Sequence, residues 1–90
     1  MGRPILGTVQ YFEPRTEGKG DHTVWFFTLA TVEGGKSGRI IPVEIEGSRF
    51  VGAVRLGDII EVKGKWKEGN KPLRVKEVYN RTLGCKAGRK

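Results

Sequence analysis

The chain has 90 residues, of which 37% are hydrophobic and 30% charged, and this length allows one small domain with a single core. It contains one cysteine, one histidine and no run of about 18 apolar residues, which excludes a disulfide scaffold, a zinc finger and a membrane-spanning helix. No hydrophobic segment typical of a signal peptide follows Met1, so we expect a cytoplasmic protein, and we expect no metal or other cofactor.

The formal net charge of +7 is concentrated at one end of the chain. Residues 1–62 hold seven basic and eight acidic side chains, a net charge of −1, whereas residues 63–90 hold ten basic and two acidic ones, a net charge of +8. Such asymmetry indicates a polyanionic partner. The simpler interpretation is a solvated surface with a basic tail.

Five strands separated by turn residues are predicted, at 5–12, 23–32, 39–45, 58–66 and 73–79. In the second strand Trp25, Phe27 and Leu29 alternate onto one face, which we expect to form the core. Ile41, Val43 and Ile45 of the third strand and Ile60 and Val62 of the fourth share this inward pattern.

Between the third and fourth strands we expect one short helix. Ser48 is a suitable N-cap, Phe50, Val51 and Val54 lie on one helical face, and Gly57 ends the helix. In the fifth strand Leu73 and Val75 face inward, and the step from Val75 to Val78 breaks the two-residue period, which predicts a bulge. Residues 81–90 show no periodicity and are predicted to be a flexible basic tail or linker, so the domain spans 1–80.

This order of elements resembles the OB fold (oligonucleotide/oligosaccharide-binding), a five-stranded Greek-key barrel with a helix between strands three and four. The resemblance rests on Gly7-x-Val9, on Trp25-x-Phe27-x-Leu29, on the stretch from Gly57-Asp58 to Gly64, and on Leu73-x-Val75. Within the family the chain is most similar to single-strand-binding modules of the replication-protein-A type. The alternative fold is an SH3-like barrel. Two features depart from the family pattern: the long turn at 33–38, and Glu44 and Glu46 on or beside the outer face of the third strand.

The strongest functional signal is a set of cations interleaved with aromatic rings in the last two predicted strands and their loop. Single-stranded nucleic acids bind through cations that neutralise phosphates and rings that stack on bases. In an OB fold the loops at 67–72 and 14–21 border the ligand groove. The predicted nucleic-acid-binding residues are therefore Arg15, Lys19, Phe26, Lys63, Lys65, Trp66, Lys67, Lys71, Arg74, Lys76 and Tyr79.

For several of these residues a structural role competes with the binding role. Trp66 could plug the end of the barrel, Phe26 could cover the helix or the tail, and Lys63, Lys65 and Lys76 could form an ordinary solvated face. No nucleophile, base and orienting group are brought together by the pattern, and His22 is the only histidine, so we expect a non-enzymatic protein. The predicted function is single-stranded DNA or RNA binding; the alternative is a protein-interaction or assembly module of a larger protein.

Overall fold

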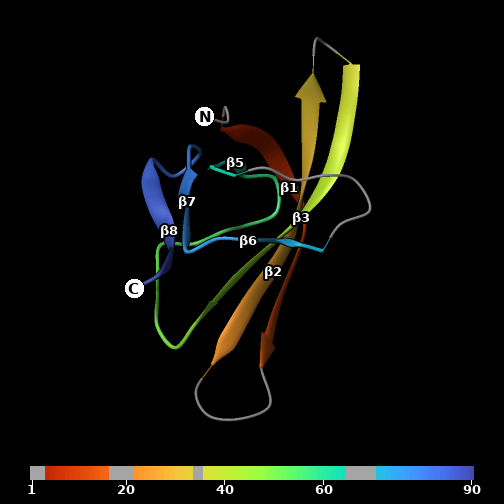
Figure 1. Cartoon of the computed structure of the whole chain (residues 1–90). Coiled ribbons are helices and arrows are strands. Elements are labelled where there is room, and N and C mark those ends of the chain that lie inside the picture. Colours follow the sequence, from red (N-terminus) through yellow and green to blue (C-terminus); the bar gives the residue numbers. More distant parts are fainter. Residues whose placement is uncertain (1–3, 17–21, 34–35, 65–70) are drawn as a thin grey trace.

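A computed structural model of the chain describes residues 4–16, 22–33, 36–64 and 71–90, and at 32, 33, 36 and 37 it describes the backbone alone. Every regular element in these residues is a β-strand, which confirms the all-β class (Figure 1). The strands are β1 (Ile5–Thr16), β2 (Thr23–Glu33), β3 (Lys36–Gly47), β4 (Phe50–Val51), β5 (Ile59–Val62), β6 (Leu73–Arg74), β7 (Glu77–Asn80) and β8 (Cys85–Arg89). Within this part of the chain, no helix is long and apolar enough to cross a membrane.

The strands form one sheet in the order β4-β8-β7-β5-β1-β2-β3-β6. Three long strands, β1, β2 and β3, make an antiparallel meander, and β5 adds to the free side of β1. The last pair, β3 with β6, is parallel, with Val43 opposite Leu73. The predicted first, second and third strands are thus confirmed, each longer than the sequence indicated.

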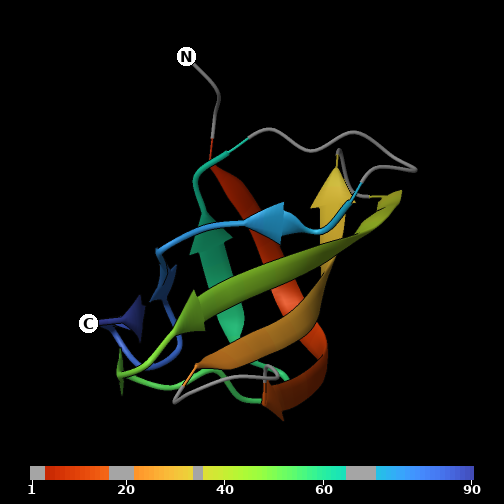
Figure 2. The same ribbon diagram turned by 60° about the horizontal axis from the view of Figure 1, so that its bottom comes forward.

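The expected closed barrel is not what the strand pairing forms. The described sheet is open, with β4 at one end and β6 at the other. The predicted fifth strand is divided at Val75 and Lys76 into β6 and β7, so the break in period marks a change of pairing partner and not the predicted bulge. There the Val75 amide donates to the Glu44 carbonyl of β3 (3.1 Å), while the Lys76 carbonyl accepts from Arg89 of β8 (3.0 Å). Within these two residues the chain passes from β6, which pairs with β3, to β7, which pairs with β5 and β8 (Figure 2).

The prediction of a helix between the third and fourth predicted strands is wrong. Residues 50–51 form strand β4, which pairs with β8, and Gly52 has a φ of +72°, outside the helical region. The Phe50 ring stacks on Trp25 of β2, with ring centroids 4.2 Å apart. The Ala53 carbonyl accepts a hydrogen bond from the Asn80 side chain of β7 (2.9 Å). Contacts with distant strands have thus replaced the weak local helical preference of a segment containing Gly52.

The predicted tail at 81–90 also requires correction, because half of it, Cys85–Arg89, is strand β8. This strand pairs antiparallel with β7 over four residues and with β4 over two, so it connects the two. Ala87 is fully buried in the core. Gly88 lies opposite Glu77, where a Cβ atom would come within 2.6 Å of the Glu77 Cα, so only glycine allows the two strands to approach this closely.

The core lies on the inner side of the curled sheet. The alternation predicted for β2, β3 and β5 is confirmed: Phe27, Leu29, Ile41, Val43, Ile45, Ile60 and Val62 are all fully buried. Trp25, also predicted to face inward, is only partly buried and packs at the edge of this core. Leu73 and Val75 pack against it from the segment that crosses from β3 to β7. The opposite faces of β1, β2 and β3 are therefore the outer surface of the meander.

Candidate nucleic-acid interface

An aromatic pair, Tyr11 of β1 and Phe26 of β2, lies on the outer surface of the meander. Phe26 alternates with the buried Phe27, and in the strand pairing it lies between Glu13 and Glu44. The Tyr11 and Phe26 rings meet edge to face, with centroids 6.1 Å apart, and Tyr11 is 45% exposed. Two rings of this kind offer faces on which a flat ligand can stack.

Arg15 of β1 completes this cluster. Its guanidinium carbon lies 4.3 Å from the centre of the Phe26 ring, a cation–π contact, and its Nε donates to Glu13. The Tyr11 hydroxyl donates to the other oxygen of the same carboxylate. These two hydrogen bonds hold the pKa of Glu13 below its ordinary value, and the bond to Glu13 raises the pKa of Tyr11. Glu13 is therefore ionised at neutral pH and orients both the phenol and the guanidinium.

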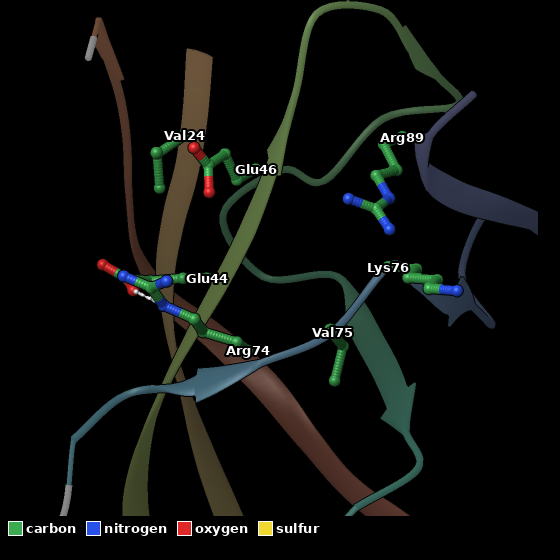
Figure 3. A pocket seen from close by; sticks show the side chains of 7 residues that line it. All are labelled: Val24, Glu44, Glu46, Arg74, Val75, Lys76 and Arg89. Atoms are coloured by element: carbon green, nitrogen blue, oxygen red, sulfur yellow. Dashed lines mark hydrogen bonds and ion pairs between the residues drawn. The ribbon is translucent and has the colours of Figure 1, made fainter. Parts of the chain in front are cut away.

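Beside the cluster, a pocket of about 240 Å³ lies between β2, β3, the β6–β7 break and β8 (Figure 3). Glu44 and Glu46 of β3 lie on one side of it, and Lys76 and Arg89 on the other. Val24 and Val75 are its apolar lining residues. The pocket thus presents two acidic side chains and a cationic wall to any ligand.

The carboxylates of this pocket have partners. Arg74 of β6 reaches Glu44, with Nε 3.3 Å from Oε1, and His22 Nδ1 is 3.7 Å from Glu46 Oε2. By contrast, neither Lys76 nor Arg89 forms an ion pair with another described residue. A cation without a carboxylate partner remains available to a phosphate group.

The structure divides the predicted binding residues into two groups. Arg15, Phe26 and Arg74 lie on the outer surface of the meander and β6. Lys63 and Tyr79 line a separate groove over β5 and β7, and Lys76 lines both that groove and the pocket. Lys71 is exposed just before β6. Four other predicted residues, Lys19, Lys65, Trp66 and Lys67, lie outside the described residues.

The sequence pattern does not single out Tyr11 or Arg89. By simple alternation Tyr11 would share the inward side of the buried Val9, but a bulge between these two residues shifts the register and turns Tyr11 outward. Arg89 was assigned to the tail, and it reaches the pocket only because β8 is part of the sheet. No local signal in the sequence marks either residue.

Comparison with protein-family models, with curated proteins and with solved structures finds no match to this chain. Among the described residues, no three His, Cys, Asp or Glu side chains are grouped so that they could hold a metal ion. The candidate site is therefore defined by its own geometry.

Proposed function

We propose that this chain is a non-enzymatic module that binds single-stranded nucleic acid across the outer surface of β2, β3 and β6. The observation that carries the proposal is the exposed Tyr11–Phe26 pair with Arg15 against it, next to the cationic wall of Lys76 and Arg89. Single-stranded nucleic acids are bound mainly by two interactions, in which aromatic rings stack on bases and cations neutralise phosphates, and this surface has groups for both.

We also propose that the fold is of the OB type, which is described as a partly open five-stranded Greek-key barrel. Four pairings support this: β1 with β2, β1 with β5, β2 with β3, and the parallel pairing of β3 with β6. The absence of a helix at 48–57 and the additional strand β8 are departures from that pattern. The face of the second and third strands is the surface that OB folds use for oligonucleotides.

The charged side chains of this surface favour one orientation of the bound nucleic acid. Glu44 and Glu46 of β3 repel phosphates, whereas residues 71–90, which form β6, β7 and β8, hold seven basic side chains and one acidic one. Phosphates are therefore expected on the side of Lys76 and Arg89, with bases directed to Tyr11 and Phe26. This arrangement places each chemical group of the ligand opposite its complement.

The proposal is tested by fluorescence anisotropy of labelled dT and U 12-mers at two salt concentrations. If Lys76 and Arg89 each contact a phosphate, raising the salt fourfold from about 50 mM should weaken binding about sevenfold, at a slope of about −0.7 per contact. Tyr11→Ala should remove about 1–3 kcal/mol of stacking energy, whereas Tyr11→Phe, which keeps the ring, should bind like the wild type.

Arg89→Gln should lower the salt slope by about 0.7, and Arg49→Gln, which removes one charge outside the pocket, serves as the charge-matched control. Equal effects of these two variants would mean that only overall charge matters. Absence of binding at 50 mM salt would rule out the proposed function. A difference between dT and U would identify the preferred nucleic acid, since the two differ in the 2′-hydroxyl of the sugar and in the C5 methyl group of the base.

A second candidate function, a protein-interaction module, is favoured by one observation. Ile40 of β3 is 57% exposed on the same outer face as Phe26, where it lies opposite Ala30. Ile40 and the carboxylates of Glu44 and Glu46 make the outer face of β3 partly apolar and partly acidic, which suits contact with a protein surface better than contact with a phosphate backbone. Weak oligonucleotide binding that is unaffected by Tyr11→Ala would favour this candidate.

A further inference from the structure

A second groove, of about 560 Å³, lies over β5, β7 and β8. Its charged and aromatic lining residues are Glu61, Lys63, Lys76, Glu77, Tyr79 and Lys86. This surface is not the face of β2 and β3 that the proposed function uses. Val75 and Lys76, at the break between β6 and β7, line both the pocket and this groove, so the two sites are contiguous there.

The acidic side chains of the groove are both paired. Arg81 donates to Glu61 through Nη2 and Nε, at 2.8 and 3.0 Å, and Lys86 Nζ is 3.3 Å from Glu77. Lys63 and Lys76 form no ion pair with the residues the structure describes. Since the carboxylates are neutralised locally, the groove has two ammonium groups to offer to an anion.

Tyr79 supplies an aromatic ring in the middle of this groove. In the strand pairing it stands between Glu61 of β5 and Lys86 of β8, and it is 41% exposed. The residues on either side of it in sequence, Val78 and Asn80, are buried, so the outward position of Tyr79 follows from the alternation of β7. A half-exposed ring that shares a groove with Lys63 and Lys76 combines a stacking surface with cations, as Phe26 and Arg15 do on the outer surface.

We propose that a single strand of nucleic acid continues past Lys76 into this groove, where Lys63 and Lys76 contact phosphates and Tyr79 stacks on a base. This inference rests on the proposed function and extends its site around the edge formed by the β6–β7 break. It implies that a short oligonucleotide occupies only the outer surface of β2 and β3, whereas a longer one occupies both surfaces.

The test measures the affinities of a dT 4-mer and a dT 12-mer for the full chain by anisotropy. Tyr79→Ala should weaken binding of the 12-mer about 5- to 150-fold and leave the 4-mer unchanged. Lys63→Gln should lower the salt slope of the 12-mer by about 0.7. Two matched controls are Tyr79→Phe, which keeps the ring, and Arg49→Gln, which removes a charge that lines neither site; both should bind like the wild type.

The outcomes separate this inference from the proposed function. If Tyr79→Ala and Lys63→Gln bind the 12-mer like the wild type while Tyr11→Ala does not, the groove is unused and the proposed function stands. If Tyr79→Ala weakens the 4-mer equally, or if Tyr11→Ala has no effect on the 12-mer, the continuous path is wrong. If the wild type binds neither oligonucleotide, both proposals fail. Lys63→Gln keeps the test valid should Tyr79→Ala fail to fold, because Lys63 is exposed.

Discussion

Replacing Asn80 with alanine should destabilise the fold strongly, because this fully buried side chain joins three segments. Its Nδ2 donates to Asp58 Oδ2 (2.8 Å) and to the Ala53 carbonyl (2.9 Å), and its Oδ1 accepts from the Leu83 amide (3.0 Å). Asp58 in turn accepts a hydrogen bond from the Arg55 amide (3.0 Å). The network holds the chain between β4 and β5 against the end of β7.

The magnitude follows from the partners that lose their bonds. A hydrogen bond to the buried carboxylate of Asp58 contributes about 1.5–3 kcal/mol and the bond to the Ala53 carbonyl about 1 kcal/mol, whereas Leu83 is exposed and its amide can bond to water. We therefore expect Asn80→Ala to lower the free energy of unfolding by roughly 2.5–4 kcal/mol. For a domain of this size that corresponds to a fall in Tm of about 10–30 °C.

Urea denaturation followed by tryptophan fluorescence measures this change, provided that the m-value stays the same. The control is Arg81→Gln, which removes an ion pair on a largely exposed side chain and should cost less than about 1 kcal/mol. A loss of less than about 1 kcal/mol for Asn80→Ala would refute the view that this network is what replaces the expected helix. Asn80→Asp is a second check, because a carboxylate beside Asp58 should destabilise the fold at neutral pH and less so in acid.

Three further outcomes are expected. Burial raises the pKa of Asp58, but the hydrogen bonds that it accepts from Asn80 and Arg55 outweigh this and hold the pKa below its ordinary value of 3.8. The stability of the fold should therefore fall as the pH drops below about 4. In Asp58→Asn, thermal melts should show a Tm that changes less with pH in this range. Truncation after Asn80 removes β8 and the buried Ala87, so the shortened chain should lose its cooperative thermal transition; a melt within a few degrees of the full chain would restore the tail interpretation. The pKa of Tyr11, raised chiefly by its hydrogen bond to Glu13, should move toward its ordinary value of 10.0 in Glu13→Gln, as NMR titration of labelled tyrosine would report; no movement would argue against that bond.

Local patterns in the sequence determined the parts of the fold that depend on alternation. In the middle of β2 and β3 every second residue is large and apolar, namely Trp25, Phe27 and Leu29 and then Ile41, Val43 and Ile45, and an extended chain removes them from water together by burying one face. The strand class, the inward faces of β2, β3 and β5, and the break at 75–76 followed from this. The placement of Phe26 on the face opposite Phe27 also followed from this alternation, whereas the side of Tyr79, which follows the break, did not.

Tertiary structure alone decided the features that depend on pairing between distant segments. Phe50 lies in a strand rather than a helix because β8 and Trp25 offer it partners that no nearby residue supplies. Arg89 joins the candidate site because β8 completes the sheet, and Tyr11 does so because one bulge reverses the side on which it points. These outcomes depend on contacts between residues far apart in sequence. Such contacts cannot be predicted from a short window of sequence, because tertiary contacts override the weak local preferences for helix or strand.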